Sequence, residues 1–174
     1  MKKILIILFI YALHADFAIA NISIAFIDMD KIISTSKPGS FILSQLNDVN
    51  LKNSTKLEND AKKLKKKETK LIAQKNILSE VDFKANANKL KLEYNDFNVN
   101  RDKIRKDFNN LRIENINKLM KLINPILVNY SNEKSISMIL KKKDLVIGKT
   151  DLNITDEIIK IINRDIKQFK IRSE

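Results

Sequence analysis

The sequence predicts a mainly α-helical protein with a small β-containing body, from which one long antiparallel helical hairpin (a coiled-coil arm) projects. Three observations support this fold class. The 174 residues include only two Gly and two Pro, the 85 residues from Ser40 to Asn124 contain neither, and apolar side chains recur at helical spacing through that stretch. Because turns depend on Gly and Pro, we expect this stretch to be helical with at most one tight break.

Composition excludes several classes of site. A phosphate-binding loop needs clustered glycines, but Gly39 and Gly148 stand 109 positions apart. The absence of Cys excludes disulfides, cysteine–zinc sites and cysteine nucleophiles, and the single His is His14, which lies in the leader segment. The sequence therefore predicts no cofactor, no metal site and no catalytic residues, and so a protein that is not an enzyme.

Residues 1–20 have the order of a secretory signal peptide. Lys2 and Lys3 precede a ten-residue apolar run, and Ala18-Ile19-Ala20 forms a small-x-small cleavage site. The run is short for a membrane span, which needs about 20 residues; an uncleaved anchor is the alternative. Cleavage after Ala20 leaves 31 basic and 20 acidic side chains, a net charge of +11. We therefore expect an exported, basic protein.

The first elements of the mature chain are a strand and a short helix. Ile22, Ile24 and Phe26 alternate along residues 22–28, as in a half-buried strand. A short helix over residues 30–36 is then expected to end at Lys37-Pro38-Gly39.

The arm is predicted as two helices, over about residues 40–78 and 80–131. On the first, a leucine recurs every seven residues, with less apolar residues between the leucines: Leu57, Ala61, Leu64, Glu68, Leu71, Lys75 and Leu78. The second has a seam of alternating four- and three-residue steps: Leu90, Tyr94, Phe97, Arg101, Ile104, Phe108 and Leu111.

The two patterns are out of register near residues 77–83, so the tip of the hairpin is placed there. Ser79-Glu80-Val81-Asp82 has the form of a capping box, which begins a new helix. Pro125 predicts a bend of the second helix where the arm enters the body.

Six lysines fall within nine residues of the first arm helix: Lys62, Lys63, Lys65, Lys66, Lys67 and Lys70. A solvated helix face explains much of this pattern. Because lysines three or four positions apart repel one another, we also expect a binding role for them.

The C-terminal region predicts two more strands, over residues 135–141 and 144–148, and a final helix capped by Thr155. The body, formed by residues 21–40 and 120–174, then contains a sheet too small to be stable alone. We expect it to self-associate through apolar residues of its strands: Ile22, Ile24, Phe26, Ile136, Met138 and Leu140.

The chain after residue 20 resembles the Skp/OmpH family of periplasmic chaperones. The resemblance is strongest in residues 24–33 and 136–140, followed by residues 146–148 and 151–159; the last run matches a family pattern of Asp-(Leu/Ile)-x-Ile-Thr. It implies a homotrimer that assembles through its strands and encloses unfolded outer-membrane β-barrel proteins between three arms in the periplasm, without ATP.

The resemblance also suggests lipopolysaccharide as a partner, for which the candidates are Lys103, Arg105, Lys106 and Arg112. The positive charge of an exported chain suggests an anionic membrane surface as another partner. For the client protein, we expect diffuse binding by the six lysines and by apolar residues near the tip: Leu71, Ile72, Ile77, Val81 and Phe83. Steering by charge and weak apolar burial suit a client that must later be released.

Two other functions stay open. A basic nucleic-acid-binding protein fits the charge, but the signal peptide and the lack of aromatic residues among the basic ones argue against it, so no nucleic acid is expected as a partner. A structural envelope coiled coil would require longer heptads and a lipid-anchoring Cys or a membrane span.

Overall fold

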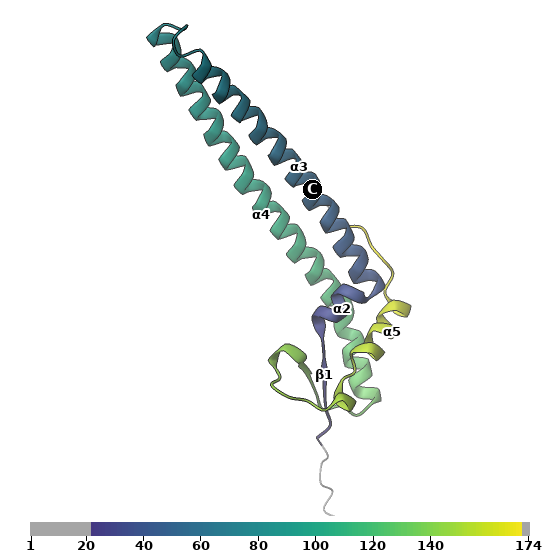
Figure 1. Cartoon of the computed structure of the whole chain (residues 1–174). Coiled ribbons are helices and arrows are strands. Elements are labelled where there is room, and N and C mark those ends of the chain that lie inside the picture. Colours follow the sequence, from purple (N-terminus) through teal and green to yellow (C-terminus); the bar gives the residue numbers. More distant parts are fainter. Residues whose placement is uncertain (1–21, 172–174) are drawn as a thin grey trace, which may run out of the picture.

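The structure, a computed structural model, describes residues 22–171 and shows a long helical hairpin standing on a small α/β body (Figure 1). The predicted signal peptide and its cleavage site lie outside the described residues. In chain order the elements are β1 (Ile24–Ile27), α2 (Met29–Thr35), α3 (Lys37–Ala73), α4 (Glu80–Glu133), β2 (Met138–Lys141), the 3-10 helices η1 (Lys142–Asp144) and η2 (Thr150–Leu152), and α5 (Thr155–Asp165). The predicted fold class is confirmed.

The tip of the arm is a turn over residues 74–79, and α3 ends five residues earlier than expected. Without a Gly to reverse the chain tightly, the turn takes several residues, and the Ile77 and Leu78 amides both donate to the Gln74 carbonyl at 3.0 Å. Ser79 begins α4 as predicted: its Oγ accepts from the Asp82 amide at 3.1 Å and donates to the Asp82 carboxylate at 2.6 Å.

The sheet has two parallel strands, with Ile24 paired to Met138 and Phe26 to Leu140. The predicted strand over residues 144–148 is wrong: residues 145–149 have no regular structure. The other edge of β1 is instead taken by a chain segment further on, because the Ile154 amide donates to the Phe26 carbonyl at 3.1 Å. Residues 144–148 therefore have no edge of β1 to join.

The segment Lys37-Pro38-Gly39 begins α3 and does not end α2, which is a second correction. Ser36 separates the two helices and caps α3, its Oγ accepting from the Gly39 amide at 3.3 Å. Pro38 lies in the first turn of α3, where the missing N–H has no helical partner to lose. Further along the chain, α4 runs on through Pro125.

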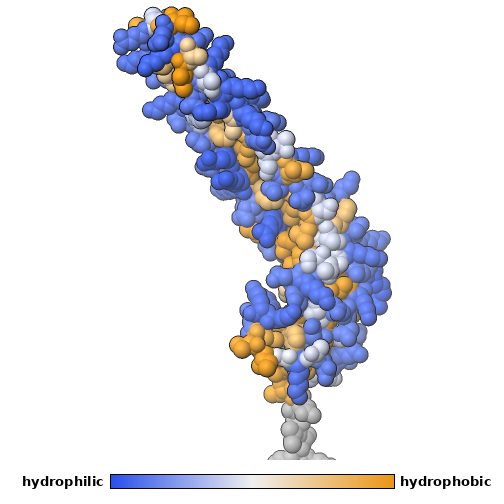
Figure 2. Space-filling view, viewed as in Figure 1, coloured by the Kyte–Doolittle hydropathy of each residue, from blue (hydrophilic) through white to orange (hydrophobic). Residues whose placement is uncertain are grey.

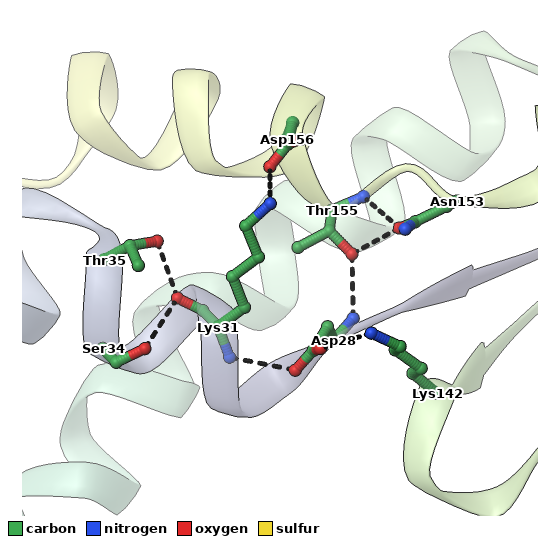
Figure 3. Close-up of polar contacts among 8 residues, drawn as sticks. All are labelled: Asp28, Lys31, Ser34, Thr35, Lys142, Asn153, Thr155 and Asp156. Carbon is green, nitrogen blue, oxygen red and sulfur yellow. Dashed lines mark hydrogen bonds and ion pairs between the residues drawn. The ribbon is translucent and has the colours of Figure 1, made fainter. Parts of the chain in front are cut away.

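The prediction that Thr155 caps α5 is wrong, because its side chain makes no capping hydrogen bond. Thr155 instead joins the N-terminal and C-terminal parts of the body (Figure 3). Its buried hydroxyl accepts from the Asp28 amide at 2.9 Å and also contacts Asn153. Asp28 in turn caps α2 by accepting from the Lys31 amide at 2.9 Å, and the Lys31 ammonium pairs with Asp156 at 2.6 Å. These bonds fix β1 and α2 against the start of α5.

The core lies at the base of the arm, where α2, α3, α4 and α5 meet. Its fully buried aliphatic side chains are Ile32, Ile42, Leu119, Ile123, Ile158 and Ile162. Gly39 allows α2 and α3 to approach closely at this point, because a Cβ atom there would lie 2.1 Å from the Ile33 carbonyl oxygen. A side chain at position 39 would therefore separate the two helices.

We predict that Gly39→Ala lowers the free energy of unfolding by about 3 kcal/mol, since the clash is with backbone and the fully packed core resists the shift. Gly148→Ala is the matched control: the atoms nearest its Cβ would belong to the side-chain ring of Phe26, at 3.0 Å, and not to a helix backbone. Chemical denaturation of both variants measures the difference. Equal stability of the two variants would contradict the packing described for Gly39.

Candidate functional site

The arm is held together by a narrow apolar seam. On α4, all seven residues predicted for the seam are half-buried, and on α3 Leu64 is buried between the half-buried Leu57 and Leu71. Ala61 and Lys75, which the heptad pattern assigned to the seam, are exposed, and their places are taken by Asp60 and Gln74. The seam is therefore thin and partly polar on the α3 side.

A polar cluster joins the two helices in the distal part of the arm, near the tip, and fixes their register. Glu68 of α3 accepts from the Lys65 ammonium at 2.9 Å and from the Tyr94 hydroxyl of α4 at 3.3 Å. The hydrogen bond from Lys65 is the main reason why the pKa of Glu68 lies below its ordinary value. The pKa of the Tyr94 phenol is raised, chiefly because burial removes solvent from the ring and secondly because the Glu68 carboxylate is nearby. Close by, Lys67 of α3 pairs with Glu93 of α4 at 2.7 Å.

Four of the six clustered lysines have an acidic partner. Besides the pairs of Lys65 and Lys67, Lys62 contacts Glu58 and Lys63 contacts Asp60. Within residues 22–171, Lys66 and Lys70 make no ion pair. The lysine run is thus better neutralised than its sequence alone suggested, because acids just before it and on the opposite helix reach its ammonium groups.

The tip exposes aliphatic side chains to solvent, which Figure 2 shows as an apolar group at the distal end of the arm. Ile72 is 62% exposed, Ile77 80% and Val81 78%. Leu71 and Phe83, the other two apolar residues predicted here, are half-buried. The end of the arm furthest from the body therefore offers apolar contact area that no part of the described chain covers.

The residues predicted to carry assembly divide into two groups. Phe26 is buried under the loop that contains Gly148, and Ile136 and Leu140 are half-buried. The remaining three are exposed: Ile22, Ile24 and Met138.

A second exposed apolar group lies next to these, in the loop after β2. Val146 and Ile147 are 104% and 90% exposed, and Figure 2 shows an apolar patch on this side of the body. The sequence shows this group as the apolar run Leu145-Val146-Ile147, whose pattern predicts a strand. Between β2 and α4 there is also an open cleft of about 300 Å³, lined by Leu127, Val128 and Met138 among others. Exposed apolar patches of this kind mark interaction surfaces.

The basic residues considered for lipopolysaccharide lie along α4 in the lower half of the arm. Lys103 is paired with Asp107 at 2.6 Å, while Arg105, Lys106 and Arg112 are exposed. No helix within residues 22–171 is long and apolar enough to cross a membrane. The same residues contain no group of three or more His, Cys, Asp or Glu side chains placed to hold a metal ion.

Comparisons with known proteins give one family and one shared architecture. The model of a family described as outer membrane protein (OmpH-like) matches residues 23–162, so the match ends within α5. No curated protein matches the chain. Among solved structures, the crystal structure of a candidate outer membrane chaperone (OmpH-like) from Caulobacter crescentus CB15 has a TM-score of 0.74, with 14% identity, over 85% of this chain and 88% of that one. At this identity the likeness establishes the fold.

We predict that Glu68→Gln lowers the pKa of the Tyr94 phenol, because a neutral amide no longer opposes the charge of the phenolate. The pKa should remain above the ordinary value of 10.0, since Tyr94 stays half-buried. Ultraviolet titration of the phenolate measures the pKa of Tyr94. Tyr130 is the internal reference, because it lies far from Glu68 in the chain and its pKa is raised chiefly by burial. An unchanged Tyr94 titration would mean that the helices pair in another register.

Proposed function

The chain belongs to the OmpH-like family of outer membrane proteins, and we propose that it is an ATP-independent periplasmic holdase. In this role it binds unfolded outer-membrane β-barrel proteins between helical arms and prevents their aggregation, without catalysis. The description of its structural neighbour as an outer membrane chaperone supports the proposal. The observation that carries it is an arm whose apolar side chains remain exposed at its distal end, while its core is confined to the base.

Capture of a client on such a surface combines two weak interactions, attraction between charges and contact between apolar side chains. The ammonium groups of Lys66 and Lys70, which have no ion-pair partner within residues 22–171, attract acidic segments of a client over a long range. Exposed ion pairs are individually worth about 0–1 kcal/mol, so a carboxylate of the client can replace Glu58 or Asp60 on a neighbouring lysine at little cost. Ile72, Ile77 and Val81 then give apolar contact without a closed pocket, which suits a client that must leave and fold elsewhere.

We further propose that the body, residues 21–40 and 120–174, assembles three chains, and that residues 41–119 form the client-binding arm. Two observations support assembly through the body. The free edge of β2 has no strand beside it among the described residues, and Val146 and Ile147 next to it are fully open to solvent. A second copy of the chain would cover both features, and a closed ring would leave no exposed strand edge.

We predict that charge reversal on the arm slows client capture at low salt. In Lys66→Glu/Lys70→Glu, the association rate with an acidic, urea-unfolded β-barrel protein should fall severalfold at 0.1 M salt. The effect should vanish near 1 M salt, where the Debye length has fallen from about 10 Å to about 3 Å. The control, Lys134→Glu/Lys160→Glu, makes the same change of net charge on the body. Stopped-flow fluorescence that showed equal slowing in both variants would mean that net charge, and not the arm, directs capture.

We predict that Ile147→Asp yields single chains, while the wild-type protein elutes at the mass of three. Because Ile147 is exposed in the single chain, the substitution costs little there but places an unpaired charge in the proposed interface. Val99→Asp, at a position exposed on the arm, is the control and should remain trimeric. The test is size-exclusion chromatography with light scattering on residues 21–174; a trimeric Ile147→Asp or a monomeric wild-type protein would refute the assignment.

A further inference from the structure

The segment after α5, residues 166–171, crosses back onto the base of the arm, where Figure 1 shows it beside α3. We call this segment the strap. Ile166 leaves the helix in an extended conformation, with φ −101° and ψ 116°. Ile166, Phe169 and Ile171 are half-buried and pack against the core, whereas Lys167 and Lys170 are exposed. The strap is thus an extended peptide that presents apolar side chains to the protein at positions 169 and 171 and a polar one to solvent between them.

Side chains of the arm hold the strap by its backbone. Gln45 of α3 donates to the Phe169 carbonyl at 3.3 Å and accepts from the Ile171 amide at 3.2 Å. One side-chain amide therefore binds a backbone carbonyl and a backbone N–H on the same edge of the strap. Gln168 donates to the Lys37 carbonyl at 3.3 Å. The Lys118 ammonium of α4 lies 4.3 Å from the centre of the Phe169 ring. Both arm helices therefore contribute to the contact.

These contacts make the strap replaceable. No backbone–backbone hydrogen bond joins residues 167–171 to any other part of the described chain, and the clamp of Gln45 depends on an extended backbone and not on the identity of the side chains. What the site holds is a pair of apolar side chains at alternate positions, Phe169 and Ile171, on either side of the exposed Lys170. That alternation is also the pattern of the membrane-spanning strands of β-barrels, which place apolar and polar residues in turn.

We propose that the surface beneath the strap is a peptide-binding groove, and that an extended client segment with apolar residues at alternate positions displaces the strap to occupy it. This inference rests on the proposed holdase function and adds a defined subsite to the diffuse surface of the arm. In the free protein the strap fills the groove and covers its apolar lining. A client must compete with the strap, which weakens its apparent affinity and favours its release.

Two full-length variants test the groove directly. In Phe169→Asn/Ile171→Asn the strap no longer fits, so the groove is open; in the control, Lys167→Asn/Lys170→Asn, only outward-facing residues change. A fluorescein-labelled peptide with the sequence of residues 165–171 should bind the open variant about tenfold more tightly than it binds the wild type or the control, by fluorescence anisotropy. Adding Gln45→Leu to the open variant should weaken this binding about tenfold, because two hydrogen bonds to the peptide are lost. Equal binding by the open variant and the control would overturn the proposal.

A second measurement keeps the native strap in place. Because the chain has no Cys, Lys170→Cys carries a single nitroxide label at an exposed position of the strap. Addition of a urea-unfolded eight-stranded β-barrel protein should narrow the label's resonance lines as the strap is released. An unchanged spectrum while client and protein co-elute would refute the groove but leave the holdase function standing. If no client co-elutes, the proposed function itself fails, and the groove with it.

Discussion

The aliphatic cluster at the base of the hairpin is the constraint on which the other features depend. Ile42 of α3, Leu119 and Ile123 of α4, and Ile158 and Ile162 of α5 are all removed from water, each contributing about 1.5–3 kcal/mol. Along residues 50–110, by contrast, Leu64 alone is buried. The hairpin is therefore anchored at one end, and its far end is held by a narrow seam and a few polar bonds. This division leaves most of the arm's surface available for contacts with other molecules.

The polar contacts of the arm serve specificity more than stability. The Glu68–Tyr94 hydrogen bond and the Lys67–Glu93 pair join side chains of different helices, so they select one register among several that a thin leucine seam would permit. Surface pairs of this kind contribute little free energy, and the ammonium groups remain accessible. The lysines thus help to align the arm, and under the proposed function the same ammonium groups would attract acidic segments of a client.

Local signals in the sequence predicted local structure well. Ser79 and Asp82 are three residues apart, so the start of α4 was predictable, and the seam of α4 follows directly from its spacing. Contacts between distant residues were not predictable in this way. Thr155 has the appearance of a helix cap, but its hydroxyl accepts from Asp28, 127 positions earlier. Residues 144–148 contain the apolar run Leu145-Val146-Ile147, which favours a strand, yet the edge of β1 is taken by Ile154.

In the candidate site, too, contacts between residues far apart in the sequence were not predictable. The sequence identified the lysine run and the apolar tip but not the acidic partners across the hairpin, because the pairing of Lys67 with Glu93 depends on the register of two helices. The strap was not predictable either: the alternation of Phe169, Lys170 and Ile171 is too short to indicate a strand, and its role is visible only because Gln45 binds the backbone there.

In the proposed function the arm, and not the body, holds the client. Amide hydrogen exchange of residues 21–174, with and without a urea-unfolded eight-stranded β-barrel protein, distinguishes the two locations. We expect slower amide exchange on residues 60–95, which include the lysine run and the tip, and no change in β1 and β2. Slower exchange confined to the two strands and residues 145–149, with the arm unaffected, would contradict it.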